Sequence, residues 1–232
     1  MDAAALVREI EARVENLAVR NAVALRALRR EYSKRVQPET AADVVKLATE
    51  LIARGRVHRF FGDELIMSRS DALATLNRST VEGLGAHLTS WDQVDCFACC
   101  LSGPAWREGQ IGDEAIAEWA RSEDRWWRRA ALVSTVPLNV KARGGMGDAP
   151  RTLRICRLLV DDRDPMVMKA LSWALRALAM RDSAAVRQFL EEELRLPALV
   201  RREVGHKLAT GRKNPGSAAR HGRSGTIRKG EG

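Results

Sequence analysis

The sequence predicts an all-α protein built from a string of short helices. Ala, Leu, Arg and Glu, which favour helices, dominate its 232 residues. Runs of alternating Val, Ile, Thr and Tyr between turn residues, the usual signal for strands, are missing. Apolar residues instead recur three and four positions apart, with short Gly- and Pro-containing segments between the periodic stretches.

The elements follow from this periodicity in chain order. In residues 2–34, Leu6, Ile10 and Val14 recur at helical spacing, which predicts one or two amphipathic helices with a charged outer face. Pro38 ends that stretch, because the residue before a proline avoids the α conformation. Further helices are predicted at 40–54, 56–66, 70–78, 91–102, 111–121, 125–137, 150–160, 165–180, 183–194 and 198–209. The predicted connections include Gly103-Pro104, residues 141–150 and residues 195–197.

Two of these helices repeat one pattern at an offset of 40 residues. Asp124 precedes the helix that contains Arg129, and Asp164 precedes the helix that contains Lys169. A helix pair that recurs at this period is typical of HEAT-type repeats. We therefore expect residues 1–210 to form one HEAT-like repeat α-solenoid of stacked antiparallel helix pairs. Its concave, basic face would fit an elongated partner such as a duplex or another helix.

The charge is unevenly distributed along the chain. Lys and Arg number 39 against 30 Asp and Glu, a net charge of +9. Residues 211–232 lack apolar periodicity and hold six Lys or Arg against one Glu, so we expect a basic disordered tail. Such a tail either adds salt-sensitive affinity for polyanions or acts as a solubilising end.

Several classes of protein are not expected. No window approaches eighteen consecutive apolar residues, so neither a membrane span nor a secretory signal is predicted, and we expect a cytoplasmic, nucleoid-associated protein. Cys96, Cys99 and Cys100 lie at helical spacing as a packing stripe, without a second ligand pair for zinc. The Gly-rich residues 144–147 lack the Lys of a phosphate loop and are interpreted as a connection. No metal or cofactor is expected.

The first candidate site lies at the start of the 91–102 helix. Ser90 and Gln93 form the pattern of a capping box. Trp91 and Asp95 then share one helix face, where they can present an aromatic ring and a carboxylate to a cationic ligand. The structural alternative is that Trp91 packs and Asp95 stabilises the helix N-terminus.

A second candidate site begins at Asp124, which is expected to cap the arginine-rich helix predicted at 125–137. Arg128 and Arg129 are candidates for binding a phosphate. The alternative is that the Asp and Arg tie neighbouring helices of the repeat together. Trp126 is expected in the core and Trp127 in the groove.

The C-terminal third adds further cations. Lys169, Trp173 and Arg176 share one helix face and are candidates for contact with a nucleic-acid backbone, with interhelix packing as the alternative for Trp173. Arg202 and Lys207 repeat the cationic pattern in the following helix, where a solvated face is the alternative.

The segments SWDQVD (90–95), WWRRAAL (126–132) and MKALSWALR (168–176) occur in this order. They resemble the signature segments of the AlkD-like DNA alkylation repair family, HEAT-like repeat glycosylases that excise alkylated purines. The resemblance covers residues 88–210. The family has two Trp before its Asp, and this sequence has only Trp91 there. No counterpart of the family's N-terminal aromatic-rich stretch is recognised in residues 1–60, where Tyr32 is the candidate substitute for one lesion contact.

The resemblance implies a role for each matched residue. Asp95 would be the catalytic carboxylate, Trp91 and Trp173 would flank the deoxyribose, and Arg129 would hold the backbone phosphate. The expected activity is that of a monomeric, monofunctional DNA glycosylase. It would hydrolyse the N-glycosidic bond of cationic N3- or N7-alkylated purines in duplex DNA, without a base-flipping pocket. The expected DNA-binding residues are Arg128, Arg129, Lys169, Arg176, Arg202 and Lys207.

Two other functional classes remain open from the sequence. One is a non-catalytic HEAT-repeat protein that binds DNA structures, and the other is a helical scaffold that binds another protein. Retained DNA binding without base release would favour the first alternative. Weak DNA affinity with little salt dependence would favour the second.

Overall fold

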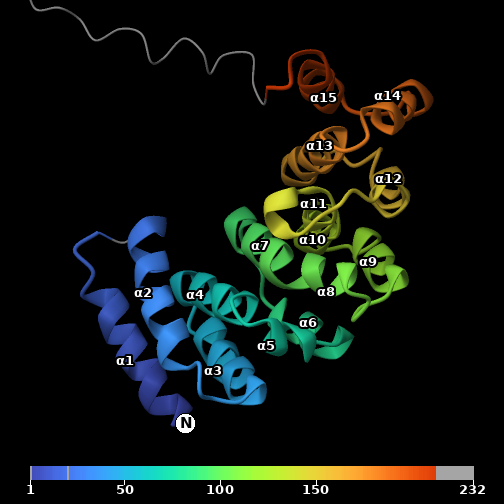
Figure 1. The fold of residues 1–232 in the computed structure, drawn as a ribbon. Helices are drawn as coiled ribbons and strands as arrows, with labels where there is room; N and C mark the ends of the chain where they lie inside the picture. The colour runs from blue at the N-terminus through green and yellow to red at the C-terminus, as the bar shows by residue number, and fades with distance from the viewer. Residues whose placement is uncertain (1, 20, 213–232) are drawn as a thin grey trace, which may run out of the picture.

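The computed structural model describes residues 2–19 and 21–212, and these residues form helices without any strand (Figure 1). Ion pairs Arg13–Glu31 and Arg35–Glu9 tie the first two helices together in antiparallel orientation. The N-terminal helices are α1 (Ala3–Glu15), α2 (Ala22–Arg35), α3 (Ala41–Ala53), α4 (Arg56–Met67), α5 (Ser70–Ala74) and α6 (Arg78–Leu84). The basic tail expected at 211–232 lies outside the described residues except for Gly211 and Arg212.

The remaining helices stack along a curved path, which confirms the all-α, solenoid-like fold (Figure 1). Helix α10 packs against α7, α9 and α13, and α13 packs in turn against α15. These helices are α7 (Trp91–Phe97), α8 (Gly103–Arg107), α9 (Asp113–Ala120), α10 (Arg125–Ser134), α11 (Val136–Asn139), α12 (Ala149–Leu158), α13 (Pro165–Ala179), α14 (Ser183–Glu192) and α15 (Ala198–Thr210). None of the described helices is long and apolar enough to cross a membrane.

Gly103-Pro104, predicted as a connection, lies inside a continuous helical segment. A π-helical turn (Ala98–Ser102) joins α7 to α8, and Pro104 sits in the first turn of α8, where a missing N–H is tolerated. Gly103 allows α11 to approach, because a Cβ there would lie 2.7 Å from Pro137 Cγ and from the Ser134 carbonyl oxygen. Helix α6 was absent from the prediction, and the helix predicted at 125–137 divides into α10 and α11 at Thr135.

The predicted helix starts have mixed outcomes. Asp124 and Asp164 cap α10 and α13, and their carboxylates accept from the backbone N–H of Trp126 at 2.8 Å and of Met166 at 2.7 Å. The capping box at Ser90 is wrong. Gln93 Oε1 instead accepts from the backbone N–H of Thr89 at 2.9 Å, while the buried Ser90 hydroxyl has no hydrogen-bond partner among the described residues.

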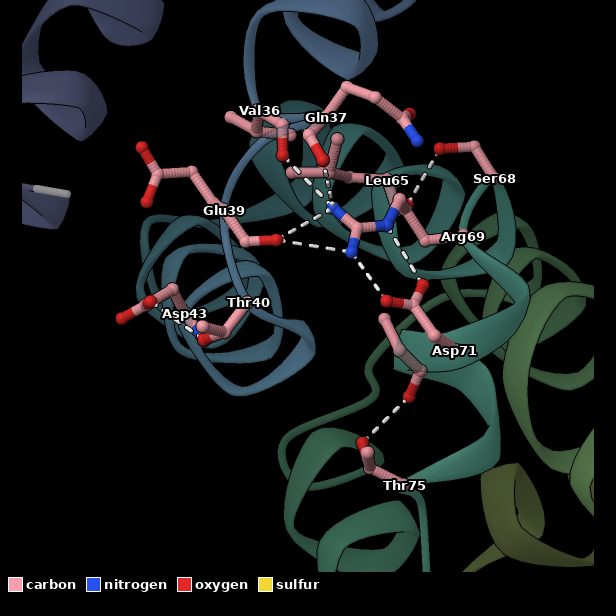
Figure 2. A network of polar contacts seen from close by, with 11 residues as sticks. Val36, Gln37, Glu39, Thr40, Asp43, Leu65, Ser68, Arg69, Asp71 and Thr75 are labelled. Carbon is pink, nitrogen blue, oxygen red and sulfur yellow. Dashed lines mark hydrogen bonds and ion pairs between the residues drawn. The ribbon is translucent and has the colours of Figure 1, made fainter.

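A polar network fixes the N-terminal helices against each other (Figure 2). The Arg69 side chain is 9% exposed and lies between the α2–α3 connection and α5. It donates to the carbonyl oxygens of Val36 at 2.9 Å and Glu39 at 3.1 Å, and it forms an ion pair with Asp71. Arg69 lies two residues after the end of α4, so these contacts hold the α2–α3 connection against the C-terminal end of α4.

Trp127, expected in the groove, belongs to the core. Its ring centroid lies 4.8 Å from that of Trp119 and 6.0 Å from that of Phe97. The indole is partly buried where α7, α9 and α10 meet, because those helices bring two other large rings to the same place. Trp126 is partly buried against the same core, as expected.

Candidate active site

Two adjoining cavities share Trp91, Asp95 and Trp173. The first cavity has a volume of about 660 Å³ and is also lined by residues of α2 and α4. The second has a volume of about 560 Å³ and is lined by residues of α10, α13 and α15. We call the two together the cleft. The structure therefore brings together three side chains that the sequence places up to 82 residues apart.

Asp95 lies on α7 and is held by Arg129 of α10. Arg129 Nε donates to Asp95 Oδ1 and Nη2 donates to Oδ2, both at 2.9 Å. Its Nη1 donates to the Met166 carbonyl oxygen at the start of α13 at 2.5 Å. The Asp95 side chain is 18% exposed and that of Arg129 is 6% exposed. The pair thus joins α7, α10 and α13 at the surface of the cleft.

Burial and neighbouring charges act in opposite directions on the pKa of Asp95. Burial raises the pKa of Asp95 to about 6, the Arg129 guanidinium lowers it, and Asp92 raises it slightly. At pH 7 the carboxyl group is therefore ionised in roughly nine of ten molecules. A partly desolvated carboxylate of this kind interacts strongly with positive charge that develops beside it.

Two indoles line the same two cavities as this carboxylate. Trp91 begins α7 and is 53% exposed, an unusual exposure for so large an apolar ring. Trp173 comes from the middle of α13, is half-buried, and packs partly against the core. Aromatic faces attract cations, so the two rings and Asp95 together form a site suited to a cationic group.

The second cavity also carries cations. Lys169 and Arg176 of α13 line it, as does Glu203 of α15. Arg176 Nε donates to the Ser172 carbonyl oxygen at 3.0 Å, and its Nη2 lies 3.9 Å from Glu203 Oε2. Burial lowers the pKa of Arg176, and Glu203 opposes that shift. Lys169 is exposed and available at the rim.

Other predicted DNA-binding residues lie outside the cleft. Arg128 is used as a structural tie: its Nε donates to Asp162 Oδ2 at 2.7 Å, and its Nη1 donates to the carbonyl oxygens of Ser122 and Glu123. Arg128 thereby joins the α9–α10 connection to the α12–α13 connection. This is the structural role given above as the alternative to phosphate binding. Arg202 is exposed on α15 but lines neither cavity, and Lys207 donates to the Gly211 carbonyl oxygen at 2.5 Å at the end of α15.

Arg129 was expected to bind a phosphate, and the structure shows how much of it remains for that role. A guanidinium has five N–H donors. Three of those of Arg129 are directed to Asp95 and Met166. Its first function in this structure is to hold Asp95, and two donors remain for another ligand.

The N-terminal wall of the cleft, formed by α2 and α4, was not predicted from the sequence. Arg26 Nε donates to Glu64 Oε1 at 2.9 Å and its guanidinium lies 5.3 Å from the centroid of the Phe60 ring. Arg59 donates to the carbonyl oxygens of Leu84 at 2.7 Å and Ala86 at 2.9 Å. The overlooked signal is Phe60-Phe61-Gly62, a short aromatic stretch that ends in Gly and begins at the edge of the 1–60 interval.

Tyr32 is not a substitute for a lesion contact. Its side chain is buried, its hydroxyl donates to Glu9 Oε1 at 2.9 Å, and its ring packs edge-on against Phe61. Tyr32 on α2 therefore joins this helix to α1 through Glu9 and to α4 through Phe61.

Cys96, Cys99 and Cys100 line the first cavity, where the thiols of Cys96 and Cys99 stay protonated. Cys96 Sγ and Cys100 Sγ lie 3.9 Å apart. The neighbouring Cys100 thiol and burial raise the pKa of Cys96, and burial raises that of Cys99 to about 12, so both thiols are neutral near pH 7. Among the described residues, no group of three or more His, Cys, Asp or Glu is arranged to hold a metal ion.

A family described as DNA alkylation repair enzyme matches residues 2–208. No curated protein matches the chain. The family match begins at residue 2, so the resemblance extends N-terminally well beyond the expected start at residue 88. It includes α2 and α4, which form the N-terminal wall of the cleft.

Proposed function

The chain belongs to the family of DNA alkylation repair enzymes, and on that premise we propose that it is a monofunctional DNA glycosylase. Its proposed substrates are cationic N3- or N7-alkylated purines in duplex DNA, whose N-glycosidic bond it hydrolyses. The observation that carries the proposal is that Asp95, Trp91 and Trp173 all line both of the adjoining cavities.

The chemistry of base loss fits these groups. When the C1′–N bond of a cationic purine breaks, its electron pair moves to the base, which leaves neutral, and positive charge develops on the sugar. The Asp95 carboxylate stabilises that charge and orients the water molecule that adds to C1′, much as carboxylates act in glycoside hydrolysis. A proton then leaves the added water, and an abasic sugar remains.

The flanking indoles favour a charged lesion over a neutral base. Each aromatic face contributes on the order of 1 to 2 kcal/mol to binding of a desolvated cation. Lys169 and Arg176 supply positive charge on the C-terminal side of the cleft, where the phosphate backbone of the duplex would run.

The proposed mechanism needs no further component. Water and a carboxylate suffice for the hydrolysis, so we propose no metal or cofactor. One chain supplies the whole cleft, so we propose that the protein acts as a monomer. HEAT-like repeats explain its open, curved form, which would accept a duplex without a closed pocket for an extruded base.

Release of free base from duplex DNA that contains 7-methylguanine tests this proposal under single-turnover conditions. Asp95→Asn is expected to bind DNA as wild type does and to release base at least about 100-fold more slowly. Asp161→Asn is the matched control, because Asp161 is exposed and pairs with Arg195 outside the cleft. Circular dichroism spectra verify that each variant is folded.

Each alternative class predicts a different result. Tight DNA binding without base release by wild type would establish a non-catalytic reader of DNA structure and refute the glycosylase. Weak DNA binding with little salt dependence would favour a protein-binding scaffold. Equal rates for wild type and Asp95→Asn would remove Asp95 from the mechanism.

A further inference from the structure

The Gly-rich segment after α11 has a fixed conformation. A 3-10 turn (Lys141–Arg143) ends at Gly144, whose φ of 83° lies in the left-handed region that favours glycine. At Gly145 a Cβ would lie 2.5 Å from the Pro137 carbonyl oxygen and 2.7 Å from Asn139 N. The glycines therefore let this segment pack directly against the backbone of α11.

Side chains from both neighbouring helices fasten the same segment. Arg107 of α8 donates to the Arg143 carbonyl oxygen. Arg181, which follows α13, donates to the carbonyl oxygens of Asn139 at 2.9 Å and Gly145 at 3.1 Å. The position of the Arg143 backbone is thus determined by the folded stack.

Arg143 extends from this segment into the first cavity, which also contains Trp91, Asp95 and Trp173. One of its donors, Nη1, reaches the Cys99 carbonyl oxygen at 3.3 Å. No ion pair joins Arg143 to a carboxylate within the described ranges 2–19 and 21–212. The residue is exposed, so its other donors face solvent.

The other guanidiniums of this cavity are already engaged. Arg26 and Arg29 both pair with Glu64, at 2.9 and 3.4 Å. Arg59 is buried and donates to two backbone carbonyl oxygens. Among these residues Arg143 has the most capacity to accept a new anionic ligand beside Asp95.

We propose that Arg143 binds a backbone phosphate of the DNA strand that passes Asp95. The family resemblance implies this role for Arg129, but Arg129 directs three donors to Asp95 and Met166. The inference rests on the proposed function only in that the cleft binds DNA, and it does not depend on base release.

The test is the salt dependence of binding to an undamaged duplex, measured by fluorescence anisotropy between 0.05 and 0.4 M NaCl. Loss of one phosphate contact lowers the slope of log Kd against log salt by about 0.9. Arg143→Gln is therefore expected to raise Kd about eightfold at 0.1 M salt and about fourfold at 0.2 M. Arg143→Lys retains the charge and is expected to keep the wild-type slope.

Two further variants separate a specific contact from a general change of charge or fold. Lys141→Gln removes one positive charge from the same segment outside the cavity, and it is expected to keep the wild-type slope. Gly145→Ala leaves Arg143 present but displaces its backbone, and it is expected to lower the slope as Arg143→Gln does.

An unchanged slope in Arg143→Gln would overturn the proposal, as would an equal loss in Lys141→Gln. A reduced slope together with absent base release by wild type would support Arg143 and refute only the glycosylase activity. Thermal unfolding of each variant identifies any loss of fold, and Arg143→Gln should unfold within a few degrees of wild type because its side chain is exposed.

Discussion

The ion pair between Arg129 and Asp95 leads to a quantitative prediction about how base release depends on pH. With a pKa of about 6, Asp95 is roughly 90% ionised at pH 7, so base release by wild type should rise with pH to a plateau above about pH 7. Arg129→Gln removes a charge whose nitrogen atoms lie 2.9 Å from both carboxylate oxygens. An opposite charge at such a distance lowers a carboxyl pKa by about 1 to 3 units.

The expected consequence is a displaced acid limb of the pH profile. If the midpoint rises by one to two pH units, the ionised fraction at pH 7 falls to about 50% or 10%, and base release slows by about two- to ninefold. Raising the pH to 8.5 should recover most of that loss. Asp95→Asn offers a contrast, because its rate should stay low at every pH.

The assay is single-turnover base release from 7-methylguanine DNA between pH 5 and 8.5, at saturating protein and after subtraction of spontaneous loss. Arg128→Gln is the control, since it removes the same charge one residue away but contacts Asp162 rather than Asp95. An Arg129→Gln profile with the wild-type midpoint, lowered equally at all pH values, would refute the role of Arg129 in holding Asp95 ionised.

Two predictions concern stability, measured by urea unfolding. Arg69→Ala should lower the free energy of unfolding by about 2 to 4 kcal/mol, because it removes a buried guanidinium that donates to the Val36 and Glu39 carbonyl oxygens and pairs with Asp71. The exposed Arg78→Ala should cost less than about 1 kcal/mol, and equal losses for the two variants would contradict this prediction. Burial raises the pKa of Asp63 to about 7, so its contribution to stability is present below about pH 4 and is lost as the pH rises through 7. Asp63→Asn should therefore show a smaller fall in unfolding free energy between pH 5 and 8 than wild type does, with a residual fall from Asp95, and an unchanged difference would show that Asp63 does not titrate in this range.

Local patterns in the sequence were enough for the fold class and for most helix positions. Helical periodicity and caps such as Asp124 and Asp164 depend on residues within a few positions of each other, so they can be interpreted without a structure. The signature segments around Asp95, Arg129 and Trp173 also identified side chains that the fold brings to one cleft. Errors arose where local signals were overruled by packing, as at Gly103-Pro104, which α11 covers within a continuous helix.

The sequence by itself determined the all-α fold class of the folded part and identified which carboxylate and indoles are candidates for its chemistry. Only the tertiary structure decided which cations are available to a ligand. Arg128, Arg129 and Arg143 look alike in the sequence, yet one ties two loops, one holds Asp95, and one faces the cleft with donors to spare. The physical reason is that an arginine's availability depends on the carboxylates and carbonyl groups that distant helices bring to it, and those partners lie 34 or more residues away for each of these contacts between helices.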